Sequence, residues 1–191
     1  MSGAPSILVV TGASGAGKTT VVKQLAGRAI EGVGCFFFDS IGVPTSEAMK
    51  RDFGSGLEWQ RQATMRWIER LSKNIDGLQV AVLDGQVRPT FVMEGFESAH
   101  VARGLIVLLD CSAETRRARL RGERGQPELV TPEMDCWAAY LRGQADALRL
   151  PVLDTTSLDV QQATAGLIGH IERIRFSLYA DSHIDAPSTP P

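Results

Sequence analysis

One short segment, Gly12-Ala13-Ser14-Gly15-Ala16-Gly17-Lys18-Thr19, constrains the fold of this 191-residue chain more than any other. It fits the pattern G-x-x-x-x-G-K-[ST], in which glycines let backbone N–H groups curl around phosphate groups. A β-branched apolar run over residues 7–10 precedes it, and apolar residues at helical spacing follow from Lys18 to about Ile30. A strand, a glycine-rich turn and a helix N-terminus in this order predict a phosphate-binding loop.

Four more short apolar runs predict further strands, and helical segments separate them. The runs cover residues 35–38, 80–83, 105–109 and 151–153. Strands that alternate with helices form right-handed crossovers, which give a parallel sheet covered on both faces. We therefore predict a three-layer α/β fold with a five-stranded parallel sheet, helices on both faces and a short arginine-rich lid.

The chain has the length and apolar content of one domain, which we expect over residues 1–180. Within it we expect an acceptor-binding helical region at 44–76 and the lid at 119–131. Trp59 and Trp67 share a helical face there and are expected in the core. Residues 181–191 lack apolar periodicity and contain several prolines and serines, so we expect a disordered tail.

The composition excludes several classes of partner. A formal net charge of −2 gives no general attraction for nucleic acid or anionic lipid, so neither partner is expected. No apolar run approaches the length of a membrane span, and the N-terminus lacks a signal-peptide pattern. The 3 cysteines are widely spaced and predict neither disulfides nor a zinc site, so a reducing cytoplasm is expected. The oligomeric state stays open.

The glycine-rich segment predicts ATP and Mg²⁺ as cofactors. Lys18 is expected to reach the β- and γ-phosphates, and the hydroxyl of Thr19 is expected to bind Mg²⁺. Asp84 follows the third apolar run, where a carboxylate holds Mg²⁺ directly or through water, although it also fits a solvated turn before glycine. The nucleotide is expected to contact Gly12, Ala13, Ser14, Gly15, Ala16, Gly17, Lys18, Thr19 and Thr20.

Acidic side chains follow the predicted strands, at the sheet edge where ligands of α/β proteins bind. Asp39 follows the second strand, where it would face the phosphates and act as a general base toward a hydroxyl acceptor. It also fits a role as a cap of the turn that begins with Ser40.

The segment Leu83-Asp84-Gly85-Gln86-Val87-Arg88-Pro89-Thr90 resembles the Leu-Asp-Gly-Phe-Pro-Arg-Thr segment of adenylate kinases. It departs from that pattern at Val87, where the family has proline, and at Pro89, which intervenes before Thr90. The resemblance implies that Asp84 positions the metal. It also implies that Arg88 binds a phosphate of the acceptor or the transferred group.

The arginine-rich segment over residues 111–124 is similar to the helix and lid of adenylate-, shikimate- and gluconate-kinase-like enzymes. The resemblance implies that arginines close over the phosphoryl groups, and Arg119, Arg121 and Arg124 are the expected lid residues. Arg116 and Arg117 adjoin on a helix and cannot face the same way, so one of them is expected in solvent or paired with an acid such as Glu114. The alternative is a charged helix end with no ligand.

Residues 151–156 resemble the last strand and the Asp-Thr-Ser/Thr turn of small P-loop kinases, near the adenine ring. The resemblance implies a nucleotide contact for Thr155. An alternative is that Thr155 helps to cap the final helix, with Asp159 nearby.

These expectations converge on a phosphotransferase that moves the γ-phosphate of Mg·ATP to a small-molecule acceptor. The segment from Asp84 to Arg88 favours a nucleoside monophosphate or similar acceptor, and Asp39 favours a hydroxyl such as that of a sugar, polyol, shikimate-like acid or antibiotic. Arg51 is a further candidate for an acceptor phosphate, or a solvent-facing residue. A regulatory nucleotide-binding ATPase is the alternative from another class.

Overall fold

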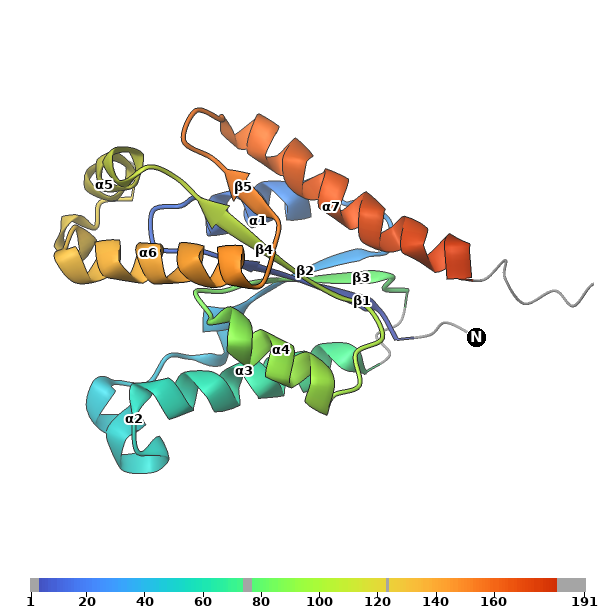
Figure 1. Cartoon of the computed structure of the whole chain (residues 1–191), viewed down its shortest axis with the longest axis horizontal. Coiled ribbons are helices and arrows are strands. Elements are labelled where there is room, and N and C mark those ends of the chain that lie inside the picture. The colour runs from blue at the N-terminus through green and yellow to red at the C-terminus, as the bar shows by residue number, and fades with distance from the viewer. Residues whose placement is uncertain (1–3, 74–76, 123, 182–191) are drawn as a thin grey trace, which may run out of the picture.

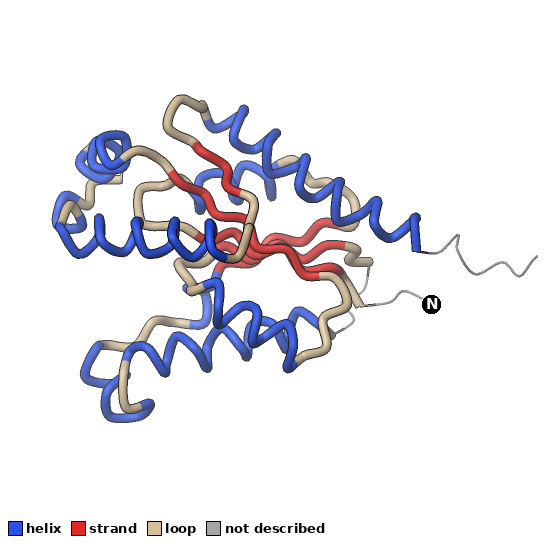
Figure 2. The backbone as a smooth tube through the Cα atoms, viewed as in Figure 1, coloured by secondary structure: helices blue, strands red, loops and turns tan. Residues whose placement is uncertain are grey.

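The structure, a computed structural model, describes residues 4–73, 77–122 and 124–181. Its centre is one sheet of five parallel strands in the order β2-β3-β1-β4-β5 (Figures 1 and 2). The strands are β1 (Ser6–Thr11), β2 (Val33–Phe37), β3 (Val80–Asp84), β4 (Gly104–Asp110) and β5 (Val152–Asp154). The five-stranded parallel sheet expected from the sequence is confirmed.

Helices cover both faces of the sheet, as the alternating pattern predicts. In Figure 1, α1 and α7 lie on one face, and α3 and α4 lie on the other. The helices are α1 (Lys18–Gly27), α2 (Ser46–Phe53), α3 (Gly56–Ser72), α4 (Pro89–Ser98), α5 (Ala113–Arg121), α6 (Pro132–Ala147) and α7 (Val160–Asp181). Two short 3₁₀ helices, η1 (Phe38–Ile41) and η2 (Pro127–Leu129), complete the described elements.

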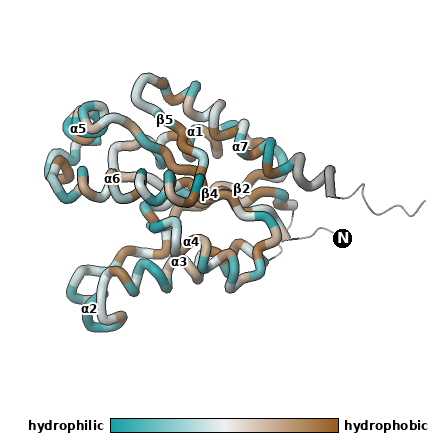
Figure 3. The backbone as a smooth tube through the Cα atoms, viewed as in Figure 1, coloured by the Kyte–Doolittle hydropathy of each residue, from teal (hydrophilic) through white to brown (hydrophobic). Residues whose placement is uncertain are grey.

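The alternation of side chains along β1 divides the interior into two cores. Leu8 and Val10 belong to the core beneath α1 and α7, while Ile7 and Val9 belong to the core beneath α3 and α4. Hydrophobic residues gather along the sheet between these layers (Figure 3). Because β1 is buried on both faces and pairs with β3 and β4, its carboxyl end is held at the centre of the fold.

The second core contains the tryptophans expected there. Trp67 is buried, and partly buried Trp59 packs against the same cluster. The indole N–H of Trp67 donates a hydrogen bond to the backbone oxygen of Phe38 at 3.1 Å. These contacts explain a correction to the predicted second strand, which ends at Phe37 because Phe38 turns into the core and begins η1.

Two other expectations concern residues at or beyond the limits of the described ranges. The last helix continues through Asp181, so the predicted domain boundary at residue 180 falls inside α7. The rest of the predicted tail, residues 182–191, lies outside the described residues, as does Ile75 of the predicted acceptor helix. No helix in the described ranges combines the length and apolarity that crossing a membrane requires.

Candidate active site

The loop from Gly12 to Gly17 joins β1 to α1 and depends on glycine at several positions. The φ angles of Gly12, Gly15 and Gly17 are 153°, 84° and 93°, in the region that side chains rarely adopt. At Gly12 there is also no space, because a Cβ atom would lie 2.2 Å from the backbone oxygen of Leu109 in β4. The sequence therefore encodes a glycine-dependent loop of the kind whose backbone N–H groups surround an anion.

We expect Gly12→Ala to destabilise the protein by at least about 2 kcal/mol, because it adds both backbone strain and a clash with β4. Urea unfolding followed by circular dichroism would measure the loss. Gly169→Ala is the matched control, since Gly169 lies within α7 with no atom near its Cβ position, and it should stabilise the protein by about 0.5–1 kcal/mol. Equal stability of Gly12→Ala and the wild type would contradict this account of the loop.

Lys18 is the first residue of α1, and its side chain is buried beneath the loop. Its Nζ donates a hydrogen bond to the backbone oxygen of Ala13 at 3.1 Å, across the turn. Burial lowers the pKa of Lys18 from 10.5 to about 8; Asp84 and Asp39 oppose the shift, and the charge of Arg124 adds to it. A phosphate anion beside Lys18 would restore its ordinary affinity for a proton.

This shift predicts that nucleotide affinity falls with pH. Above about pH 8 the free protein loses the Lys18 proton, which the complex must take up again, so affinity should fall roughly tenfold between pH 7 and pH 9. Isothermal titration calorimetry in buffers of different ionisation enthalpy would detect both the loss and the proton uptake. A constant affinity over this range, with no proton uptake, would contradict the expectation.

Thr19 and Asp84 form the polar pair expected for a metal. The Thr19 hydroxyl donates to Asp84 Oδ2 at 2.6 Å, which joins the N-terminus of α1 to the end of β3. Asp84 Oδ1 is buried without a hydrogen-bond partner, and burial raises the pKa of the carboxyl group. A hydroxyl beside an unsatisfied carboxylate oxygen is a donor set that Mg²⁺ accepts, so these residues fit the expected cation.

Asp39 lies in η1 and is exposed. Its charge acts on both Lys18 and Asp84, so the carboxylate faces the P-loop side of the sheet edge. The η1 turn is closed by the N–H of Gly42 on the backbone oxygen of Asp39, and no hydrogen bond to its carboxylate is found among the described residues. The side chain therefore does not cap the turn, which removes one of the two interpretations.

Thr155 follows β5 and joins three elements. Its buried hydroxyl lies 3.0 Å from the backbone oxygen of Ala16 and 3.1 Å from that of Asp110, and it accepts a hydrogen bond from Arg119 Nη1 at 3.0 Å. The expected capping role is wrong. The carboxylate of Asp159 accepts the N–H of Gln162 at 2.8 Å and caps the start of α7.

A hollow of about 530 Å³ lies beside the loop, between α1, α5 and the start of α7. We call it the α1 hollow; Gly15, Gly17, Thr19, Arg119, Arg124, Thr155 and Val160 are among the residues that line it. Two of the three expected lid arginines, Arg119 and Arg124, are therefore brought to the loop. Arg121 is not, because it lies on the opposite face of α5 and lines a separate hollow with Arg117.

Arg116 and Arg117 point to the same partner, which was not expected. Both donate to the carboxylate of Asp135 in the first turn of α6, Arg116 at 2.6 Å. One of the two was expected in solvent or paired with an acid such as Glu114. Arg117 is exposed and pairs with an acid, and that acid is Asp135 of the next helix instead of Glu114. Arg116 is buried and Arg117 is exposed, so the adjacent arginines do face different ways.

Arg88 precedes α4, but its guanidinium is engaged by residues that carry no motif. It donates to Gln60 Oε1 in α3 and lies 4.6 Å from the ring centre of Trp137 in α6. Gln60 also donates to the backbone oxygen of Gln86 at 3.0 Å, and Ser14 donates to Gln86 Oε1 at 2.9 Å. These contacts link the P-loop to α3, α4 and α6. In the sequence, only the position of Gln86, two residues after Asp84, indicates such a link.

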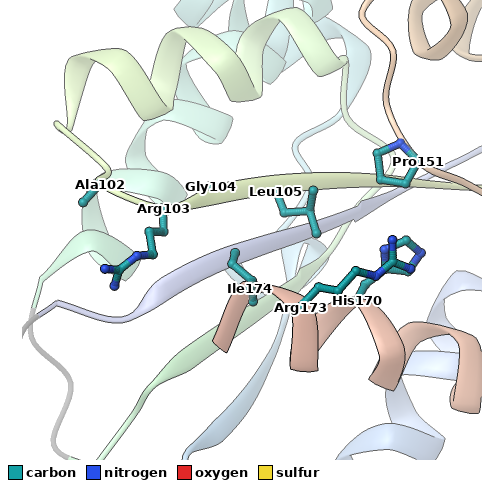
Figure 4. Close-up of a pocket in the computed structure, with 8 residues that line it drawn as sticks. All are labelled: Ala102, Arg103, Gly104, Leu105, Pro151, His170, Arg173 and Ile174. Atoms are coloured by element: carbon teal, nitrogen blue, oxygen red, sulfur yellow. The ribbon is translucent and has the colours of Figure 1, made fainter. Parts of the chain in front are cut away.

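Another hollow lies at the opposite end of the strands, before β4 and β5 (Figure 4). His170 and Arg173 of α7 lie beneath Pro151 there, whereas Arg103 points away from them. Burial lowers the pKa of His170. No group of three potential metal-ligating side chains occurs anywhere in the described part of the chain.

The loop glycines, Lys18 and the Thr19–Asp84 pair at the carboxyl edge of the sheet place the chain in the class of P-loop α/β proteins with a kinase-like fold. The chain belongs to the AAA domain family, which matches residues 8–136. A comparison with curated protein sequences gave no match.

Solved structures share the fold over nearly the whole chain. A gluconokinase from Sinorhizobium meliloti 1021 superposes with a TM-score of 0.64 at 20% sequence identity, covering 95% of this chain and 100% of that one. A shikimate kinase from Acinetobacter baumannii, in complex with shikimate, gives a TM-score of 0.53 at 16% identity, covering 88% and 94%. At this level of identity, the similarity establishes the fold.

Proposed function

We propose that the protein is an ATP-dependent phosphotransferase that moves the γ-phosphate of Mg·ATP to a small-molecule acceptor. The observation that carries the proposal is the unpaired, buried Oδ1 of Asp84, held beside Thr19 and within the electrostatic reach of Lys18. A buried carboxylate oxygen that accepts no hydrogen bond favours a cation beside it. A cation held there by Thr19 and Asp84 would neutralise charge on phosphates bound at the glycine loop.

Each residue of the site has a distinct role in this proposal. The loop N–H groups bind the phosphates, and Lys18 stabilises charge on the β- and γ-phosphates. Arg119 and Arg124 cover the nucleotide from the α5 side, and Thr155 holds Arg119 against the loop. Thr19 and Asp84 would hold Mg²⁺, which when bound supplies charge neutralisation at the transferring phosphate. Catalysis is mainly positioning and electrostatic stabilisation.

The acceptor is proposed to carry a hydroxyl, with Asp39 as its general base. An exposed carboxylate whose charge acts on Lys18 and Asp84, and which caps nothing, is suited to accept a proton. A nucleotide acceptor, suggested by the segment from Asp84 to Arg88, is less well supported, because Gln60 and Trp137 already engage Arg88. Two solved structures that share the fold are named gluconokinase and shikimate kinase, and they support the proposal of a hydroxyl acceptor.

A coupled assay of ADP release would test the function. It would compare sugars, polyols, shikimate-like acids, aminoglycosides, nucleosides and nucleoside monophosphates, each with Mg·ATP, against a control without acceptor. Stimulation by one class would identify the acceptor, and stimulation by monophosphates alone would overturn the role of Asp39. ADP release that no acceptor stimulates would instead support a regulatory ATPase. The assay needs reducing buffer, because Cys35, Cys111 and Cys136 are free thiols.

A further inference from the structure

The P-loop rests against an arginine that does not reach the α1 hollow. Gly15 lies so close to α5 that an added Cβ atom would sit 2.8 Å from Arg116 Cγ and 2.9 Å from its backbone oxygen. The Arg116 side chain is 5% exposed, and its Nη1 contacts the backbone oxygen of Cys111 at 3.4 Å. Arg116 of α5 is therefore buried where it contacts both the loop and the end of β4.

A buried guanidinium needs a counter-charge, and Asp135 is the only carboxylate that contacts Arg116 among the described residues. Arg116 Nη2 lies 2.6 Å from Asp135 Oδ1, while Arg117 donates to the other carboxylate oxygen. Arg116 Nε is buried without a partner, and the contact of Nη1 with the Cys111 backbone oxygen is long at 3.4 Å, so the 2.6 Å bond to Asp135 is the shorter of the two contacts that hold the guanidinium. Loss of the Asp135 charge would leave the buried guanidinium of Arg116 without this counter-charge.

The same carboxylate closes the base of the lid. The described residues after α5, 122 and 124–131, lead to α6, which lies beside α5 (Figure 1). Asp135 in the first turn of α6 accepts hydrogen bonds from Arg116 and Arg117 of α5. Arg119 lies one helical turn beyond Arg116, and Arg124 lies within the segment that the pair closes. The charge of Arg124 acts on Lys18, so the closed base brings arginine close to the phosphate end of the site.

We propose that Asp135, acting through Arg116, is a positioning residue that holds the lid arginines over the terminal phosphate of a nucleoside triphosphate. This inference rests on the proposed function. Asp135 itself does not contact the nucleotide in this proposal. Loss of Asp135 should therefore weaken the binding of a triphosphate more than that of a diphosphate, because Arg124 acts near Lys18 and the diphosphate lacks the terminal group.

The test is calorimetric titration of the full chain with Mg²⁺ and either the β,γ-imido analogue of ATP or ADP. Asp135→Asn should weaken binding of the triphosphate analogue about tenfold and of ADP less than threefold. Asp135→Glu, which keeps the charge, should recover most of the loss. Arg117→Ala should bind like the wild type because the Arg116–Asp135 bond remains. Asp146→Asn, at an exposed pair with Arg142 on the same helix, is the matched control.

Several results would overturn the inference. The first is a folded Asp135→Asn variant that binds both nucleotides with the affinity of the wild type. The second is a folded Asp135→Asn variant whose affinities for both nucleotides fall equally, with no recovery in Asp135→Glu. If Asp135→Asn does not fold, Arg116→Lys keeps the buried charge but loses the planar fork, and unchanged triphosphate affinity in that variant would reject the link. A wild-type protein that binds neither nucleotide would overturn the proposed function and this inference together.

Discussion

Lys18→Ala should lower the rate of phosphoryl transfer about a thousandfold while the protein remains folded. The substitution removes the buried positive charge that the loop directs at the transferring phosphate, and such a charge stabilises the transition state more than the ground state. The fold should persist because the loop conformation depends on its glycines and on β1, β3 and β4 rather than on the Lys18 hydrogen bond. The measurement is kcat in the coupled assay.

Two further variants separate charge from packing. Lys18→Met retains most of the buried volume and should be as inactive as the alanine variant. Lys73→Ala removes an exposed lysine directly after α3 that pairs with Glu69 of that helix, and it should leave kcat unchanged. Circular dichroism and the thermal midpoint would establish that each variant is folded. Unchanged turnover in folded Lys18→Met would exclude the loop lysine from the reaction.

Asp39→Asn should lower kcat by roughly a hundredfold to ten-thousandfold, with the affinity for ATP changed about twofold or less. The amide cannot accept the proton of an acceptor hydroxyl, while the loop that binds ATP is untouched. The Coulombic support that Asp39 gives to protonated Lys18 would also disappear, so the apparent pKa of Lys18 should fall further below 8. Initial rates over a range of pH would report both effects.

Asp52→Asn is the control for this experiment, because Asp52 is an exposed carboxylate on α2 that pairs with the neighbouring Arg51. Its removal should change neither kcat nor the affinity for ATP. A fully active Asp39→Asn variant would mean that the acceptor nucleophile is already an anion. That result would return the nucleotide acceptor to first place, since a phosphate needs no general base.

The fold followed from the sequence because its signals are local. The β-branched run before Gly12 and the helical spacing after Lys18 predicted β1 and α1, and the other apolar runs predicted the remaining strands. Phe38 was misplaced because an apolar aromatic residue extends a strand pattern equally well whether it stays in the sheet or turns into the core. Its contacts with Trp59 and Trp67, which are distant in the sequence, decide between these positions.

The contacts of the arginines in α5 were harder to predict, although part of the answer was present in the sequence. Arg117 and Arg121 lie four residues apart and share one helical face, whereas Arg116 shares a face with the core residue Leu120. That periodicity separates the exposed arginines from the buried one. The partner Asp135 could not be predicted, because the packing of α6 against α5 decides which acid contacts Arg116.

The position of β1 at the centre of the sheet also bears on the order of events during synthesis. The strand that carries the glycine loop is made first, but its neighbours pair Ile7 with Ala81 on one side and with Gly104 on the other. Contacts between such distant segments close slowly and late in folding. Thr155, which ties the loop to α5, is made later still. A nascent chain on the ribosome therefore carries the complete glycine motif long before it acquires a working nucleotide site.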